Sequence, residues 1–403
     1  MTNQGSPSTK LRVCIVGGGV AAIEAALALA ELAAEQTDVT VIAPDSELVY
    51  RPMAVSEPFA AGGARHYRLA PIVADAGARL LLGRLDWIEP EKSILHTEAG
   101  EAVEYDALIL AMGGSPSRRY KHATTIDDRR LDELMHGLIE DVEGGYVQSI
   151  AFVSPGRMPW PLPLYELALL TAGRAYDMQV ELATTLVTPE DAPLAILGQT
   201  ASIAVAEVLA RAKIQTITSA YAEVPNSREV VINPGDRRLQ VDRVVALPEL
   251  AGPGVRGIPL GEHGFIRVDQ HGHVRDLDSP IFAAGDAIDF PVKQGGLGCQ
   301  QADAAAESVA ALAGAPVTPR PFHPLMHAKL LTDGKPLYLT AQITGGHGFS
   351  SEVSDTPTWS PPNKIAARYL APYLDALDQA ADRATREGRE SRTGAVPAAP
   401  ASA

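Results

Sequence analysis

The chain has 403 residues, of which 46% are hydrophobic and 21% charged, and its formal net charge is −15. This length allows two or three domains that each bury a full hydrophobic core. The negative charge argues against nucleic acid or an anionic membrane surface as the main partner, because both are held by clustered lysine and arginine.

A nucleotide-binding turn is predicted near the N-terminus, after a small polar segment, residues 1–10, that we expect to be a disordered tail. From Leu11 the sequence LRVCIVGGGVAAIEAALALAEL gives an apolar strand, a glycine turn and a helix, and DVTVIAPD follows as a second buried strand. Gly17, Gly19 and Ala22 occupy the positions of a G-x-G-x-x-G/A turn, which lets a pyrophosphate approach the helix N-terminus. A tight turn inside an α/β core is the alternative interpretation.

The second strand departs from the usual dinucleotide pattern, in which an acidic residue at its end holds a ribose hydroxyl. The position directly after VTVI is Ala43. Asp45 is the nearest acid, and it either replaces the missing group or forms a turn after Pro44. Arg51, in VYRPM, is expected to pair with a cofactor phosphate or with an acidic turn.

A second strand–helix–strand series begins at Ser149 and repeats the architecture of the first, but not its sequence. A strand at residues 102–116 that ends in a Gly-Gly turn precedes it, and SPIFAAGDAIDF follows later as a buried strand with a turn. The segment QQADAAAESVAALAGA is predicted as a helix. Beyond Pro316 the chain reads as irregular until NKIAARYLAPYLDALDQAADRA, a helical run that we expect to break at Pro372.

We therefore predict an α/β fold with two Rossmann-like dinucleotide-binding domains of the three-layer ββα type and a small C-terminal region. The first domain is expected in two pieces, residues 11–125 and 251–316, with the second domain, residues 126–250, between them. A C-terminal region, residues 317–385, and a disordered tail, residues 386–403, should follow.

Three motifs in this order resemble the pyridine nucleotide–disulfide oxidoreductase superfamily of flavoproteins: the N-terminal glycine turn, the mid-chain LILAMGGSP and the late SPIFAAGDAIDF. Within it, VYRPMAVSEPF, GDAIDFPVKQGGLGCQQADAAAESVA and KIAARYLAPYL are most similar to the sulfide:quinone oxidoreductase and flavocytochrome c sulfide dehydrogenase branch. The resemblance implies FAD as cofactor, with Asp286 on the flavin ribityl chain. The candidate cofactor-binding residues are Gly17, Gly18, Gly19, Ala21, Ala22, Asp45, Arg51, Pro52, Ala111, Gly113, Gly285, Asp286, Gly296 and Leu297.

The segment FPVKQGGLGCQQ also has a direct physical interpretation. A glycine-rich turn leads into a helix whose N-terminus carries partial positive charge, which suits the negative charge of a reduced flavin. Lys293 is a candidate for stabilising that charge, and a solvated loop lysine is the alternative. Gln300 and Gln301 could reach a flavin or a quinone, or could lie on the helix surface.

Sulfur chemistry needs a thiolate, and this chain has two cysteines, Cys14 and Cys299. The sulfide-oxidising branch uses a cysteine pair beside the flavin, one of which lies in the turn that opens the second Rossmann unit. Here that turn, SPGRMPWPLPLYELALL, has Trp160 near the expected position and no cysteine. Cys14 is expected to be a buried strand residue, which leaves Cys299 as the candidate redox-active thiol or as a small residue that fills the helix start.

The same turn lacks a second glycine motif for NAD(P)H. It offers Gly156 followed by Pro159, Pro161 and Pro163, and proline removes the backbone N–H groups that bind a pyrophosphate. The favoured function is therefore an FAD-dependent oxidoreductase that passes electrons from an unidentified small-molecule donor to a quinone or similar acceptor. An NAD(P)H-dependent reductase and a non-catalytic FAD-binding protein are the alternatives.

The remaining expectations concern location and partners. No leader segment and no apolar run of roughly 20 residues is found, which indicates a cytoplasmic protein. No metal site and no nucleic-acid partner are predicted, whereas a homodimer and a weak peripheral membrane contact stay open. One apolar face of the C-terminal run either meets a quinone or membrane or packs on the FAD domain: Ile365, Tyr369, Leu370, Tyr373 and Leu374.

Overall fold

The first domain is built on a parallel sheet of five strands in the order β20-β9-β1-β2-β5. This computed structural model describes residues 10–156, 160–344 and 348–393. The strands are Ile281–Ala283 (β20), Ala107–Leu110 (β9), Leu11–Val16 (β1), Thr37–Ala43 (β2) and Arg79–Leu82 (β5). Because β1 is central, the glycine turn at its carboxyl end lies between the ends of its neighbours β9 and β2.

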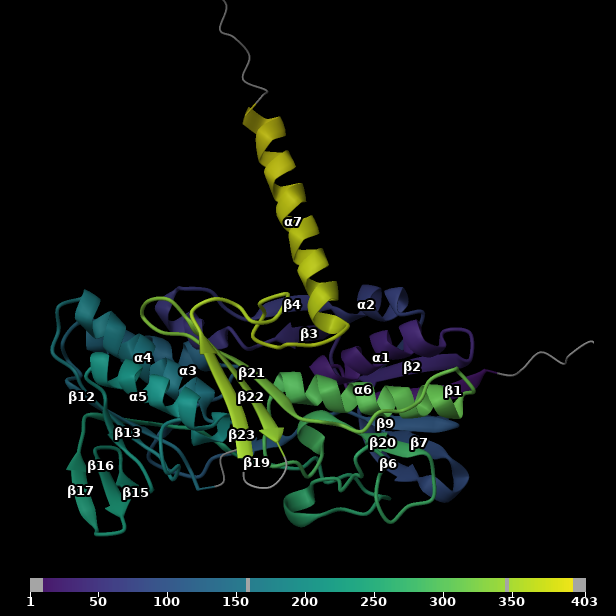
Figure 1. Ribbon diagram of the computed structural model, residues 1–403, viewed down its shortest axis with the longest axis horizontal. Coiled ribbons are helices and arrows are strands. Elements are labelled where there is room, and N and C mark those ends of the chain that lie inside the picture. Colours follow the sequence, from purple (N-terminus) through teal and green to yellow (C-terminus); the bar gives the residue numbers. More distant parts are fainter. Residues whose placement is uncertain (1–9, 157–159, 345–347, 394–403) are drawn as a thin grey trace, which may run out of the picture.

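This domain has three layers, which confirms the predicted ββα architecture (Figure 1). Helices α1 (Val20–Ala33) and α6 (Gly295–Leu312) cover one face of the sheet, and an antiparallel layer covers the other: Leu85–Glu89 (β6), Ile94–Thr97 (β7) and Ala102–Glu104 (β8). Along β1 the side chains alternate between the two cores, as the two-residue period of a strand requires. Val13 and Ile15 face the helices, whereas Cys14 and Val16 face the antiparallel layer.

The second domain has its own five-stranded parallel sheet, in the order β11-β18-β12-β13-β14. The strands are Thr124–Thr125 (β11), Arg243–Ala246 (β18), Ser149–Val153 (β12), Ala183–Val187 (β13) and Gln215–Ile217 (β14), and the helices are Leu131–Glu143 (α3), Leu162–Asp177 (α4) and Gln199–Arg211 (α5). Smaller elements complete both domains: Glu47–Tyr50 (β3), Arg65–Arg68 (β4), Leu69–Asp75 (α2), Ser115–Ser117 (β10), Tyr221–Asn226 (β15), Glu229–Asn233 (β16), Arg237–Gln240 (β17) and Glu249–Ala251 (β19).

The C-terminal region contains a three-stranded antiparallel sheet where the sequence reads as irregular. Its strands are Leu325–Leu330 (β21), Leu337–Thr344 (β22) and Gly348–Ser354 (β23). Along β21, Met326, Ala328 and Leu330 are buried in the core of the second domain, and the residues between them are half-buried. This alternation of buried and half-buried residues covers only one short strand, and the prolines around it made the sequence look irregular.

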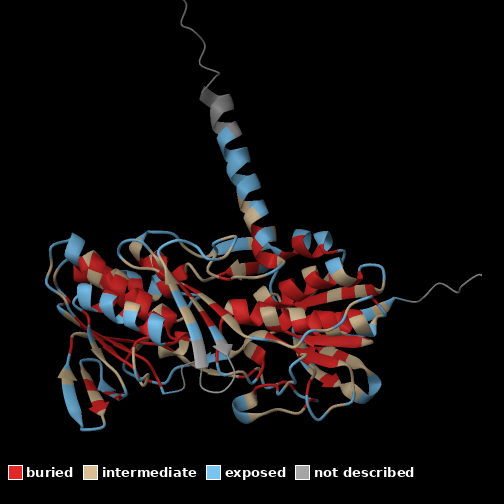
Figure 2. Cartoon of the chain, in the orientation of Figure 1, coloured by how far each residue is buried: buried red, intermediate tan, exposed pale blue. Residues whose placement is uncertain are grey.

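Helix α7 (Leu370–Thr393) differs from its prediction at both ends. It starts after residues 364–369 rather than including them, and Pro372 lies in its first turn, where the missing N–H costs no hydrogen bond and the helix does not break. The helix runs past residue 385 into the segment expected to be a tail. It projects from the body, and its residues 379–386 are exposed (Figure 2). Within the described residues, no helix is both long and apolar enough to cross a membrane.

The start of α7 is fixed by a buried carboxylate on α1. Glu24 accepts backbone N–H groups from Arg368, Tyr369 and Leu370, at 2.7, 3.0 and 2.6 Å. Burial raises the pKa of Glu24. Asp303 on α6 has its pKa raised to about 8, first by burial and then by the charge of Glu24. These two acids therefore share a site in which one of them is protonated at neutral pH.

The folded protein should take up a proton at Asp303 that the unfolded chain releases near its ordinary pKa of 3.8. Stability should therefore fall as pH rises from about 4 to about 8, by at most ~1.4 kcal/mol per pH unit for this one group. Urea unfolding at several pH values should show this slope reduced in Asp303→Asn and kept in Asp382→Asn, an exposed acid of α7. Equal slopes in the wild type and Asp303→Asn would contradict the assignment.

Candidate functional site

The glycine turn after β1 leaves an open approach to the N-terminus of α1. Gly17 has φ +137°, and a Cβ there would lie 2.3 Å from the carbonyl oxygen of Ala111, so glycine is required by packing. Gly18 is also enclosed, since its Cβ would come within 3.0 Å of Ala43. Gly19 differs, because no described residue apart from its chain neighbours has an atom within 4 Å of its Cβ position, and as the N-cap it precedes α1 without a side-chain cap. This space, in front of a helix N-terminus, fits a pyrophosphate.

Arg51 has a polar atom near this edge that protein contacts leave unused. Arg51, which follows β3, has a buried Nε with no hydrogen-bond partner in the described chain, and the nearest carboxylate oxygen, on Asp128, is 3.9 Å away. An unpartnered buried donor is costly, and a cofactor phosphate would satisfy it. Pro52 follows Arg51, and Asp45 lies exposed just after β2 at the same carboxyl edge of the sheet.

The Gly-Asp turn after β20 lies against the start of α1. Gly285 has φ +73°, a Cβ on it would lie 3.1 Å from Ala21, and its Cα closely faces Gly298 of α6. Small residues at Ala21, Ala22 and Gly298 thus allow the three elements to meet. Burial raises the pKa of Asp286, whose carboxylate has no hydrogen-bond partner among the described residues. This carboxylate is free to accept hydrogen bonds from the hydroxyls of a ligand.

Lys293 is buried, which overturns the alternative of a solvated loop lysine. Its side-chain amino group donates to the carbonyl oxygen of Ile288 and lies 4.0 Å from the ring centre of Phe265. Burial lowers the pKa of Lys293 to about 8, against the opposing charges of Asp286 and Asp289. The lysine can therefore change charge near physiological pH.

The N-terminus of α6 is shaped by glutamines that bind the backbone. Gln294 accepts the N–H of Leu297 at 2.8 Å and donates to the carbonyl of His327 at 2.9 Å. Gln300 pairs with both backbone groups of Leu325, and Gln301 accepts the N–H of Gly285 at 2.9 Å. The side chains of Gln300 and Gln301 thus bind α6 to the backbone at Leu325 and Gly285, and these amides are not free to bind a flavin or quinone.

The two cysteines lie on opposite faces of the first sheet, Cys14 towards the antiparallel layer and Cys299 towards the helices. Both are free and buried, and Cys299 Sγ contacts the carbonyl oxygen of Val20 at 3.9 Å. Burial raises the pKa of each thiol. Since the thiolate is the reactive form, Cys299 fills space at the start of α6 and is not placed to react.

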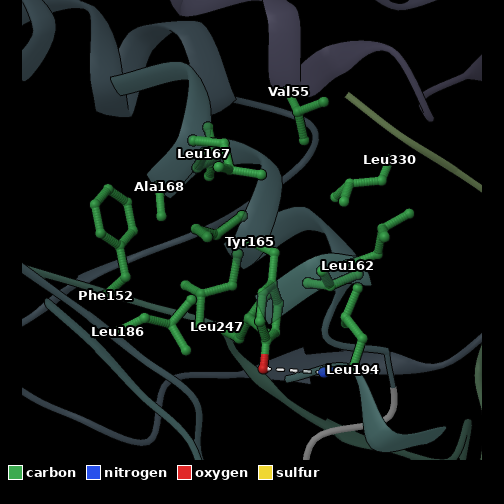
Figure 3. Packing of buried hydrophobic residues seen from close by; sticks show 14 of the residues in the cluster. Val55, Phe152, Leu162, Tyr165, Leu167, Ala168, Leu186, Leu194, Leu247 and Leu330 are labelled. Atoms are coloured by element: carbon green, nitrogen blue, oxygen red, sulfur yellow. Dashed lines mark hydrogen bonds between the residues drawn. The ribbon is translucent and has the colours of Figure 1, made fainter. Parts of the chain in front are cut away.

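Described side chains beside the turn that opens the second domain contact other parts of this domain. Trp160 is partly buried against the core of this domain, whereas Pro159 lies outside the described residues. Glu190 follows β13, where a dinucleotide site would have its ribose-binding acid. It accepts the hydroxyl of Tyr165 at 2.7 Å, and that hydroxyl also accepts the N–H of Leu194 at 3.3 Å (Figure 3). The hydroxyl of one tyrosine of α4 is therefore hydrogen-bonded both to this acid and to the loop after β13.

Two fully buried acids were missed by the sequence analysis. Glu24 and Glu166 each stand alone in an apolar helical stretch, AAIEAALALA and LYELALL. An isolated acid in such a stretch is the signal that could have identified them, because burying a carboxylate requires a partner. Glu166 has that partner in Lys364.

We also considered a surface cavity and possible metal-binding groups away from this site. A cavity of about 600 Å³ lies near Pro90, Ile258 and Asp278, at the amino end of β20 and so at the opposite edge of the sheet from the glycine turn. Among the described residues, no group of three or more His, Cys, Asp or Glu side chains could hold a metal ion.

The first domain matches the family model described as pyridine nucleotide-disulphide oxidoreductase, over residues 11–134. None of the curated proteins compared matches the sequence. Among solved structures, the sulfide:quinone oxidoreductase of the hyperthermophilic bacterium Aquifex aeolicus is similar at 17% identity and a TM-score of 0.75, over 86% of this chain and 87% of that one.

Two further structures share the fold. A ferredoxin reductase from Rhodopseudomonas palustris has 19% identity and a TM-score of 0.62, over 82% of each chain. A NAD-dependent persulfide reductase from A. fulgidus has 16% identity and a TM-score of 0.58, over 83% of this chain and 64% of that one. At such identities the likeness concerns the fold. The family match adds that residues 11–134 are similar to the pyridine nucleotide-disulphide oxidoreductases.

Proposed function

We propose that this protein is an FAD-dependent oxidoreductase of the sulfide:quinone oxidoreductase-like group, in which electrons pass from a small-molecule donor to a quinone or similar acceptor. One observation carries the proposal: a single edge of the first domain combines an open glycine turn, the unpartnered Nε of Arg51, the unpartnered carboxylate of Asp286 and the buried Lys293. Without a ligand the buried Nε of Arg51 has no hydrogen-bond partner among the described residues, which is costly.

Each residue has a distinct task toward the cofactor. FAD, when bound, would supply a ring that accepts and returns two electrons. Arg51 would hold a phosphate through its Nε, and Asp286 would accept hydrogen bonds from ribityl hydroxyls. Lys293 and the N-terminus of α6 would favour negative charge on the ring. These tasks are proposals that rest on the burial and the unused polar atoms described above.

The thiol arrangement separates this chain from cysteine-based sulfide oxidation. The sheet lies between Cys14 and Cys299, and both thiols are buried with raised pKa values. No disulfide or sulfur bridge can link them in this fold. We therefore propose a donor whose oxidation needs no protein thiol.

The second turn favours a donor other than NAD(P)H. Tyr165 binds one carboxylate oxygen of Glu190 at 2.7 Å, while the other oxygen, Oε1, is buried without a hydrogen-bond partner among the described residues. The proline-rich turn before α4 also offers fewer N–H groups to a pyrophosphate. The alternative of an NAD(P)H-dependent reductase is thus less supported than the first proposal.

Replacing Lys293 by methionine should lower the flavin midpoint potential. The variant loses a positive charge beside the site, and a tenfold effect on the redox equilibrium corresponds to ~30 mV for a two-electron couple. The difference should be largest below pH 8 and shrink above it, because the wild-type lysine then loses its own charge. Dye-equilibration titrations from pH 6 to 9 measure this, with the exposed Lys335→Met as control. A pH-independent difference, or none, would contradict the role.

Anaerobic mixing should show that sulfide and NADH reduce the bound flavin slowly, while a quinone reoxidises flavin that has been reduced by light. Sulfide should be slow because no reactive thiol faces the site. NADH should be slow because the Tyr165 hydroxyl already binds an oxygen of Glu190 beside the proline-rich turn of the second domain. Flavin absorbance at stopped-flow times is the measurement. Rapid bleaching by sulfide would disprove the thiol argument, rapid bleaching by NADH would support the alternative reductase, and failure of quinones to reoxidise the flavin would argue against the acceptor.

A further inference from the structure

A buried ion pair joins the second domain to the C-terminal region. The side-chain amino group of Lys364 lies 2.6 and 2.7 Å from the two carboxylate oxygens of Glu166 in α4. The two side chains are only 6% and 0% exposed. Burial acts on both partners in opposite directions, since it raises the pKa of Glu166 and lowers that of Lys364.

The pair connects four separate parts of the chain. Lys364 also donates to the carbonyl oxygen of Pro52 at 3.0 Å, in the loop that carries Arg51. Glu166 also accepts the N–H of Leu331, just after β21, at 2.9 Å. The first domain, the second domain, the C-terminal sheet and the segment before α7 therefore meet at one charge pair.

The residues after Lys364 cover the N-terminus of α6. The N–H of Ile365 donates to the hydroxyl of Tyr50 at 3.0 Å, which holds the segment in place. The Ile365 side chain lies 2.7 Å from the position that a Cβ on Gly295 would take. The carbonyl oxygen of Ala366 lies 3.1 Å from the position that a Cβ on Gly296 would take. This helix end therefore has a fixed carbonyl dipole and an apolar cover supplied by residues 365 and 366.

Stability alone does not explain an ion pair at this position. Apolar residues of similar volume often replace buried pairs without loss of stability, because the desolvation of two charges offsets their attraction. A buried pair with excellent geometry can instead fix the register of the elements that it joins. Here the element that it fixes is the cover of α6.

We propose that Lys364 and Glu166 are positioning residues that hold residues 365 and 366 at the N-terminus of α6 and so set the electrostatic environment of the flavin. The inference rests on the proposed function, because it takes a flavin to be the group that faces this helix end. If the pair slips, the carbonyl of Ala366 moves relative to the amides of α6, and the positive potential at the helix end changes. Neither residue needs to touch the cofactor.

The test compares three variants on the full-length protein: Lys364→Met, Glu166→Gln and the double variant. Each single variant leaves one polar group buried without its partner, so we expect lower urea unfolding midpoints, at least tenfold weaker FAD binding and a shifted flavin midpoint potential. The double variant should recover most of the unfolding midpoint, because no charge is left unpaired. Its potential should remain shifted by at least a tenfold change in the redox equilibrium, which is ~30 mV for two electrons.

Glu143→Gln provides the matched control, because it breaks a more exposed ion pair between Glu143 of α3 and Arg174 of α4, the helix that carries Glu166. It should leave FAD affinity and potential unchanged. A double variant with wild-type potential and FAD affinity would show that the pair is only structural and would overturn the inference. A wild-type protein that binds no flavin would instead overturn the proposed function and this inference together.

Discussion

Residues 364–370 are held across the molecule by buried polar anchors, and the arrangement of the candidate site depends on them. Lys364 binds Glu166 of α4, the N–H of Ile365 binds Tyr50, and Glu24 of α1 accepts three N–H groups at the start of α7. The anchors lie on helices and loops that also form the candidate site. Helix α1 begins at the glycine turn, and residues 365 and 366 cover the N-terminus of α6. The C-terminal region is therefore part of the site.

The second domain contributes side chains that hold the candidate site. Its helix α4 contributes Glu166 to the anchor and Tyr165 to the closure around Glu190. The proline-rich turn before α4 starts the helix where these two neighbouring residues face different partners. The architecture of a dinucleotide-binding domain is kept, while these two side chains of α4 bind partners within the protein.

The sequence predicted what depends on local patterns and missed what depends on distant contacts. The glycine turn, the Gly-Asp turn and the two Rossmann units follow from short motifs and from strand and helix periodicity, and the packing of Ile365, Leu370 and Leu374 on the first domain is also confirmed. The contact of Glu166 with Lys364 spans 198 residues and that of Glu24 with Arg368 spans 344, so no local pattern contains them. Burial of Lys293 and Cys299 likewise depends on elements that meet only in the fold.

Cofactor binding by a Gly19→Val variant tests the central claim, that the turn after β1 faces a flavin pyrophosphate. Apart from its chain neighbours, no described residue has an atom within 4 Å of the added Cβ, so the apoprotein should unfold at nearly the wild-type urea concentration, apart from a helix-cap cost of ~1 kcal/mol. FAD titration followed by fluorescence should show one site in the wild type and at least 100-fold weaker binding in the variant, because the side chain fills the approach to α1. Equal FAD affinity in the two proteins would contradict the account.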